Sequence, residues 1–221
     1  MDLNSPKKIV FFGDSVTEGC FELYPTSYGF DTVRHPDKAY PSLVTHVLKE
    51  KYGENIISIN AGLSGDNSKN GLERTERNVL SHKPDIVTIA FGLNDIFRPE
   101  HFEKSINGIL EKITASGAKA VLVTPNMLNT YIHEETLPSA LKVARTAMAA
   151  QTDGTLDQIY LQSLFAAKHF GAEVCDVYLF WKNLYFQGVD ITSLLVNKIN
   201  HPCEKMHIKT AEMLLQTIEK L

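Results

Sequence analysis

A serine and a histidine stand in short polar motifs near opposite ends of the chain. Ser15 follows a Gly-Asp pair at the end of the apolar run Lys8 to Phe12, and His201 precedes a proline. A serine hydroxyl becomes a nucleophile when a neighbouring base takes its proton, and imidazole often serves as that base. The pair therefore indicates acyl transfer, in which Ser15 attacks an ester carbonyl and His201 accepts the proton.

Acyl transfer also needs hydrogen-bond donors for the negative oxygen that forms on the carbonyl. Gly65 follows the apolar run Ile56 to Asn60, and Asn94 follows the run Ile86 to Phe91. The Gly65 backbone N–H, the Asn94 amide and the N–H of Ser15 itself are suitable donors, and glycine lets backbone approach the reacting carbon. Losing one such donor typically removes roughly 3–4 kcal/mol of barrier stabilisation.

Each of these residues also has a purely structural interpretation. Ser15 with Glu18 three residues later fits a capping box, or Asp14 caps the turn instead. Asn94 and Gly65 fit ordinary turn positions. His207 competes with His201 as the base, but its predicted place inside the last helix favours packing.

The elements that must position these groups are visible as periodic patterns. Apolar runs predict five strands, and stripes of apolar residues predict helices between them. The strands are predicted at Lys8 to Phe12, Ile56 to Asn60, Ile86 to Phe91, Ala120 to Thr124 and Glu173 to Val177. The helices are predicted from Tyr40 to a stop at Gly53, from Phe102 to Ile113, Leu137 to Ala150, Leu156 to Phe170 and Met206 to Leu221.

Strands that alternate with helices predict a mostly parallel sheet covered on both faces. The carboxyl ends of its strands lie on one side, so Ser15, Gly65 and Asn94 should converge there. We find no repeat or linker and predict one domain over residues 1–221. Phe21 to Asp37 is rich in aromatic and turn residues and is expected to be a long loop beside the site. Tyr24, Tyr28 and Phe30 are its candidate pocket residues.

Taken together, the motifs resemble the SGNH hydrolase family, also called the GDSL esterase/lipase family. Gly13-Asp14-Ser15 resembles its nucleophile block, Gly65 its glycine block, Asn94 its asparagine block and His201 its histidine block. The four blocks occur in the family's order and span nearly the whole chain. The resemblance implies a flavodoxin-like three-layer α/β/α sandwich with a five-stranded sheet, and ester hydrolysis without a metal.

One position departs from that family pattern. Many members carry an aspartate three residues before the histidine, where this chain has Lys198. An ammonium group cannot accept the imidazole Nδ1–H. The motif therefore supports a Ser15–His201 dyad, with the ring oriented by a main-chain carbonyl or by an acid from elsewhere, such as Asp190 or Glu204.

Composition narrows the class of protein. With 43% apolar and 22% charged residues, the chain is typical of a soluble globular protein, and its net charge of −4 argues against nonspecific nucleic-acid binding. The sequence shows no membrane-spanning run and no secretory signal, so we expect a cytoplasmic protein or a mature form. Cys20, Cys175 and Cys203 form neither a disulfide framework nor a zinc pattern, and we expect no metal and no cofactor.

The leading hypothesis is a serine esterase that acts on a small or medium ester. Candidate substrates are carbohydrate O-acetyl esters, lysophospholipids and short-chain acyl esters. An acyltransferase that uses the same acyl-enzyme is one alternative. Others are a flavodoxin-like binding protein, although Gly13 to Gly19 is neither a P-loop nor a dinucleotide fingerprint, and a non-catalytic relative that still binds esters. The sequence indicates no oligomeric state.

Overall fold

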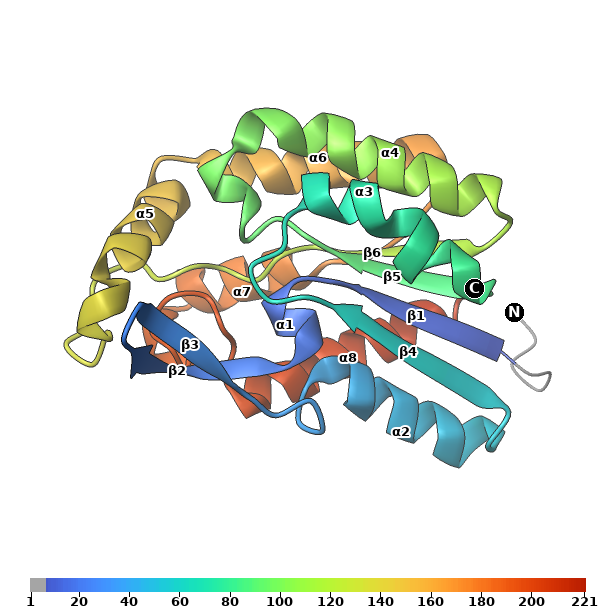
Figure 1. Cartoon of the computed structure of the whole chain (residues 1–221), viewed down its shortest axis with the longest axis horizontal. Helices are drawn as coiled ribbons and strands as arrows, with labels where there is room; N and C mark the ends of the chain where they lie inside the picture. Colours follow the sequence, from blue (N-terminus) through green and yellow to red (C-terminus); the bar gives the residue numbers. More distant parts are fainter. Residues whose placement is uncertain (1–6) are drawn as a thin grey trace.

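A five-stranded parallel sheet forms the centre of the computed structural model, which describes residues 7–221 (Figure 1). Its order is β4-β1-β5-β6-β7, and every neighbouring pair is parallel. The strands are β1 (Lys7–Gly13), β4 (Ile56–Gly62), β5 (Ile86–Ala90), β6 (Lys119–Val123) and β7 (Glu173–Cys175). All five predicted strands are confirmed and differ from the observed ones only at their ends.

Helices cover both faces of this sheet, as Figure 1 shows, which confirms the flavodoxin-like α/β/α sandwich. One face carries α2 (Tyr40–Tyr52) and α8 (Glu204–Ile218); the other carries α3 (Ser68–Asn78), α4 (Phe102–Ala115) and α6 (Thr155–Phe170). The remaining helices are α1 (Ser15–Glu18), α5 (Leu141–Thr152) and α7 (Val177–Phe186). Short 3₁₀ helices span Leu80–His82, Asp95–Phe97, Pro99–His101, Pro138–Ala140 and Thr192–Leu194. Across residues 7–221, no helix combines the length and apolar character needed to cross a bilayer.

Strand β1 is buried within the sheet along most of its length. It lies between β4 and β5, and the side chains of Ile9, Val10, Phe11 and Phe12 are buried. A strand covered on both faces needs apolar side chains at successive positions instead of alternating ones. The run Lys8 to Phe12 has that pattern, and it ends where the polar residues that follow reach the edge of the sheet.

Helix α3 lay outside the predicted helices. Its sequence is mostly polar, and its buried members are Ser68, Gly71, Arg74 and Thr75. Because no apolar stripe marks its inner face, hydrophobic periodicity could not reveal it. Tertiary contacts of small and polar side chains hold it in place instead.

The prediction of a long loop over Phe21 to Asp37 is wrong. The segment forms an antiparallel two-stranded ribbon of β2 (Cys20–Thr26) and β3 (Gly29–Arg34). Pro25 and Gly29 argued locally against strands, whereas cross-strand pairing satisfies the backbone. The ribbon lies beyond the carboxyl ends of the central strands, at the lower left of Figure 1.

Candidate active site

Ser15 lies at the point where β1 turns into α1. Asp14 is the N-cap of that short helix, and its side chain accepts a hydrogen bond from Val16 N at 3.0 Å. A Cβ on Gly13 would lie 2.2 Å from Thr17 Oγ1, so only glycine allows the turn to fold back this tightly. The Ser15 N–H belongs to the first turn of the helix, whose N–H groups have no partner within it.

The Ser15 hydroxyl and the His201 imidazole meet at this turn. Ser15 Oγ lies 3.0 Å from His201 Nε2, and His201 Nδ1 lies 2.7 Å from the main-chain oxygen of Phe21. A carbonyl oxygen only accepts hydrogen bonds, so the neutral ring carries its proton on Nδ1. Nε2 is then free to accept the Ser15 proton, which is the geometry that a general base requires.

The loop that carries His201 is organised by Asn197. Its side-chain oxygen accepts backbone N–H groups from Ile199 at 3.0 Å, Asn200 at 2.9 Å and His201 at 3.0 Å. One side chain therefore fixes the backbone on which the imidazole stands. The sequence analysis missed Asn197, although an asparagine just before a loop histidine is a signal for such a turn.

Neither acid suggested for orienting His201 contacts the ring. Asp190 Oδ2 accepts the Tyr131 hydroxyl at 2.8 Å, and Glu204 pairs with a lysine at 3.1 Å. Lys198 adopts a left-handed φ of 60° and forms an ion pair with Glu135 at 3.2 Å. Of the two kinds of group left open by the sequence, the structure contains the main-chain carbonyl, and it comes from Phe21.

Burial keeps both histidines of this region neutral. Desolvation lowers the pKa of His201 to about 4, although the bond to the Phe21 carbonyl opposes this shift. His207 is also buried; desolvation lowers its pKa to about 3, and its Nδ1 accepts Tyr40 N at 3.3 Å. His207 stacks on Phe21 with ring centroids 4.9 Å apart. It therefore packs behind the residue that orients His201, and its ring contacts Phe21 and Tyr40 instead of Ser15.

Gly65 and Asn94 lie at the ends of the neighbouring strands. Asp66 N donates to Leu63 O at 3.1 Å, so residues 63–66 form a β-turn in which Gly65 has a φ of 76°. A φ of this sign at the third position is typical of a type II turn and favours glycine. Asn94 Nδ2 donates to Asp66 O at 2.8 Å, which leaves its second N–H available.

Arg74 of α3 supports this turn from the core. Its guanidinium donates to Asp66 Oδ2 at 2.6 Å, to Ala61 O at 2.8 Å and to Gly13 O at 2.9 Å. It thereby joins the ends of β1 and β4 to the residue after Gly65. Nothing in the sequence around Arg74 marks this role, because two of its three partners are main-chain carbonyl groups at the ends of β4 and β1.

The capping box between Ser15 and Glu18, one of the structural interpretations of this motif, does not form. Asp14 caps the helix, as the alternative interpretation proposed, and Glu18 instead reaches Ser64. The carboxylate accepts Ser64 N at 2.6 Å and pairs with Arg34 of β3 at 3.0 Å. Glu18 therefore connects α1, the Gly65 turn and the ribbon.

A cleft of about 340 Å³ brings the four expected site residues together. Ser15, Gly65, Asn94 and His201 all line it. Its apolar lining comes from Leu23, Phe30, Phe97, Val143 and Ile199, and its polar lining from Thr32, Ser64, Asn67, Arg98, Asn197 and Asn200. Of the three aromatic residues proposed for the pocket, Phe30 lines this cleft, whereas Tyr28 is fully exposed at the tip of the ribbon.

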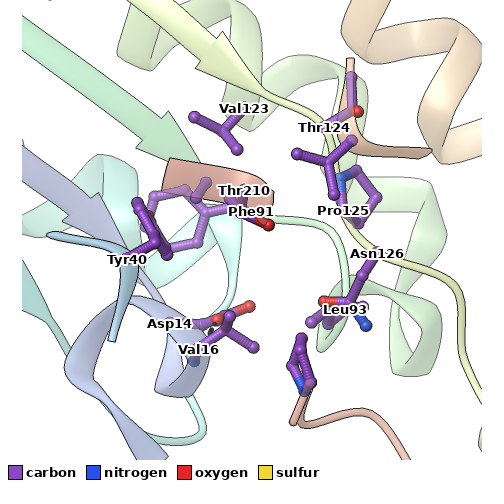
Figure 2. Close-up of a pocket in the computed structure, with 13 residues that line it drawn as sticks. Asp14, Val16, Tyr40, Phe91, Leu93, Val123, Thr124, Pro125, Asn126 and Thr210 are labelled. Carbon is purple, nitrogen blue, oxygen red and sulfur yellow. Dashed lines mark hydrogen bonds between the residues drawn. The ribbon is translucent and has the colours of Figure 1, made fainter. Parts of the chain in front are cut away.

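A second, smaller cavity of about 30 Å³ lies among the neighbours of these residues (Figure 2). Asp14 and Val16 flank Ser15 in the chain and line one side of it, with Leu93 and Asn126 across from them. Burial raises the pKa of Asp14 to about 7, and the nearby carboxylates of Asp95 and Asp66 add to the shift. Asp14 therefore caps α1 and borders this cavity, and it does not line the cleft.

Metal binding needs several ligating side chains in one place. Within residues 7–221, no group of three or more His, Cys, Asp or Glu residues is arranged to hold a metal ion. The groups that meet at the cleft are a hydroxyl, an imidazole, an amide and backbone N–H donors. Together they can bind and activate an acyl group through hydrogen bonds and proton transfer.

Comparisons with known proteins give a consistent result. The sequence pattern of the GDSL-like Lipase/Acylhydrolase family matches residues 11–202. An arylesterase from Vibrio mimicus is 34% identical over 90 residues, which are 39% of this chain and 44% of that protein. An acetylxylan esterase from Geobacillus stearothermophilus is 32% identical over 128 residues, 56% and 57% of the two chains. Esterase TesA from Pseudomonas aeruginosa is 31% identical over 163 residues, 71% and 72% of the two chains. The chain thus spans only about half the length of the first two relatives.

Solved structures share the fold over nearly the whole chain. A lipase/acylhydrolase from Enterococcus faecalis superposes with a TM-score of 0.73 at 23% identity, covering 97% of this chain and 96% of that one. A catalytic mutant of the Geobacillus stearothermophilus acetylxylan esterase also gives 0.73, at 22% identity, with 99% and 96% covered. At these identities the similarity shows a common architecture.

Proposed function

The chain belongs to the GDSL-like lipase/acylhydrolase family, and from that premise we propose that it is a serine esterase that forms an acyl-enzyme on Ser15. The observation that supports this most directly is the chain of contacts from Ser15 Oγ to His201 Nε2 at 3.0 Å and from His201 Nδ1 to Phe21 O at 2.7 Å. It provides a nucleophile, a base and a group that sets the tautomer of that base.

Acylation begins when Ser15 Oγ attacks the ester carbonyl carbon and His201 Nε2 takes the hydroxyl proton. The carbonyl oxygen becomes an oxyanion, which the N–H groups of Ser15 and Gly65 and the Asn94 amide stabilise. When the carbon–oxygen bond of the ester breaks, the protonated His201 gives its proton to the leaving alcohol. The acyl group then remains bound to Ser15.

Deacylation repeats these steps with water. His201, neutral again, takes a proton from a water molecule that attacks the acyl carbon, and the same N–H groups stabilise the second oxyanion. The bond to Ser15 Oγ breaks, His201 returns the proton to that oxygen, and the carboxylic acid leaves. The bond between His201 and the Phe21 carbonyl persists through both halves and stabilises the imidazolium as it forms.

The size and lining of the cleft support a small or medium ester as the substrate. A volume of about 340 Å³ is at the small end of ligand pockets, and one part of the lining is apolar. The polar part, from residues such as Asn67 and Asn200, suits a hydroxylated alcohol group. The names of the relatives, an arylesterase and an acetylxylan esterase, agree with substrates of this size.

Hydrolysis of p-nitrophenyl acetate by Ser15→Ala tests the assignment of the nucleophile. The hydroxyl is the group that forms the covalent intermediate, so we expect kcat to fall by about 10⁴-fold or more. Ser163→Ala is the matched control, because Ser163 is buried in α6 and its hydroxyl donates to Ile159 O within the same helix. Equal rates for wild type and Ser15→Ala would refute the proposal.

A panel of esters tests the substrate class. We expect kcat/KM to be highest for short acyl chains and for acetylated sugars, and to decline once the acyl chain exceeds the cleft. The measurement compares p-nitrophenyl esters of increasing chain length with acetyl sugars and lysolipids. A kcat/KM that rises steadily to the longest chains would contradict a substrate of small or medium size.

A further inference from the structure

We propose that Glu18 is a positioning residue that directs the N–H of Gly65 into the cleft. It does so by holding the backbone of the turn at Ser64, and it does not touch the substrate itself. The inference rests on the proposed function, since the orientation of this N–H affects the rate only if an oxyanion forms at Ser15.

The Glu18 carboxylate accepts hydrogen bonds from the Gly65 turn, from β3 and, at 3.7 Å, from Cys20 Sγ. Oε2 accepts Ser64 N at 2.6 Å, and Oε1 accepts Arg34 Nε at 3.0 Å. Glu18 stands three residues after Ser15 in the same short helix, so its own backbone moves with the nucleophile. The carboxylate therefore sets the distance between the nucleophile helix and the turn that carries Gly65.

The geometry of that turn explains why one contact can decide where the Gly65 N–H points. Gly65 N belongs to the central peptide of the turn over residues 63–66, and its φ of 76° indicates type II. Type I and type II turns differ mainly in the direction of this central peptide, and glycine can adopt both. A change from one type to the other rotates the peptide between Ser64 and Gly65. The hydrogen bond from Ser64 N to Glu18 restrains the backbone of Ser64 and thereby opposes this rotation.

The ribbon links Glu18 to the histidine side of the site. Arg34 lies at the end of β3, where its Nη1 donates to Thr32 O at 3.0 Å, and it holds Glu18 from there. On the paired strand β2, the Phe21 carbonyl orients His201 at 2.7 Å. One ribbon therefore restrains both the base and the turn that donates to the oxyanion.

Stability and positioning can be separated because this ion pair is only half-buried. The Glu18 side chain is 27% exposed and that of Arg34 is 42% exposed. Ion pairs with this exposure contribute little to folding stability. A change at Glu18 should therefore alter activity more than the unfolding temperature.

The test compares Glu18→Ala with Glu18→Gln. Alanine removes the acceptor for Ser64 N, whereas glutamine keeps an oxygen in its place. We expect Glu18→Ala to lower kcat and kcat/KM by about 10- to 100-fold, less than the full loss of an oxyanion donor, with KM unchanged. Glu18→Gln should recover most of that activity, and Arg34→Ala should give an intermediate loss.

A boronic acid that forms a tetrahedral adduct on Ser15 provides the second readout. Its affinity depends on the oxyanion donors, so Glu18→Ala should weaken binding by the same factor as kcat/KM. Glu219→Ala is the control, since Glu219, the C-cap of α8, also links two segments through a partly exposed ion pair, with Lys51 of α2 at 2.6 Å. It should leave kcat/KM and boronate binding unchanged while shifting the unfolding temperature as much as Glu18→Ala does.

The outcomes separate this inference from the proposed function. A wild-type rate in Ser15→Ala would refute the proposed function itself. If Ser15→Ala is inactive, three results for Glu18→Ala would overturn only the role of Glu18. These are a kcat/KM within about twofold of wild type, an unchanged boronate affinity, or a rise in KM alone. If Glu18→Ala does not fold, Glu18→Gln and Arg34→Ala provide the test. Equal large losses of activity in both variants would overturn the role of the Ser64 contact, because glutamine keeps the oxygen that accepts Ser64 N.

Discussion

The nucleophile side and the histidine side of the cleft are built in different ways. Ser15, Gly65 and Asn94 follow β1, β4 and β5, which are neighbours in the central sheet. His201 lies in a loop before α8, and its ring is oriented by a carbonyl 180 residues earlier in the chain, on the peripheral ribbon. The first side is set by strand register, to which the contacts of Glu18 and Arg74 add, whereas the position of the imidazole depends on hydrogen bonds between distant segments.

In the proposed mechanism, this construction allows catalysis without an acid beside the histidine. A main-chain carbonyl accepts the Nδ1 proton as an aspartate would, although it brings no full negative charge. Because any residue supplies a carbonyl, the orienting group places no constraint on the side chain at position 21. Loss of the His201 ring should therefore lower the activity strongly, whereas substitutions of Lys198 should change it little.

Loss of the imidazole should have the largest effect and tests the histidine side directly. We expect His201→Ala to lower kcat by about 10⁴-fold or more, because Ser15 then has no proton acceptor. His207→Ala removes a packed ring that makes no contact with Ser15 and should keep most of the activity. The measurement is kcat for p-nitrophenyl acetate, and the reverse pattern would assign the base to His207.

Removal of the Asn94 amide tests the sheet side. We expect Asn94→Ala to lower kcat by about 10²- to 10³-fold, the usual result of losing one oxyanion donor. Asn94→Asp keeps the shape of the side chain but not its N–H groups, so it should lose at least as much. Steady-state kinetics with a fixed ester measure both, and a loss of less than about tenfold in each would remove Asn94 from the oxyanion site.

The pH dependence should distinguish the buried His201 from an ordinary histidine. His201 must be neutral to accept the Ser15 proton, and burial lowers its pKa to about 4. As pH rises, kcat/KM should therefore increase through about pH 4 and stay flat through pH 6.5. Asp14→Asn serves as the control, because burial raises the pKa of Asp14 to about 7. An acid limb near 7 that disappears in Asp14→Asn would show that Asp14 governs the profile.

Restoring an acid before the histidine should have the smallest effect. Lys198→Asp places a carboxyl group where many family members carry one, but Nδ1 already bonds to Phe21 O at 2.7 Å. Aspartate tolerates the left-handed φ of 60° at this position. We expect kcat/KM to change by no more than about threefold, which is under 1 kcal/mol. A tenfold gain would show that the carbonyl is a poor substitute for an acid.

The sequence alone predicted the strands of the central sheet and the candidate site residues that follow three of them. A strand that is buried on both faces has apolar residues at successive positions, so a run such as Lys8 to Phe12 can be recognised from its own residues. The motifs after the runs named Ser15, Gly65 and Asn94, and the parallel arrangement implied that they converge. His201 was named by its own motif, and the structure brings it to 3.0 Å from Ser15.

Only the tertiary structure decided what holds these groups in place. The bond between His201 and the Phe21 carbonyl and the bond between Ser64 and Glu18 join residues that are 180 and 46 positions apart in the sequence and meet only after folding. Backbone carbonyl and N–H groups are the same in every residue, so the sequence carries no mark of which one becomes a partner. The sequence determines the side-chain chemistry and the local periodicity. Which backbone group forms a hydrogen bond with a given side chain is determined by how distant segments pack together.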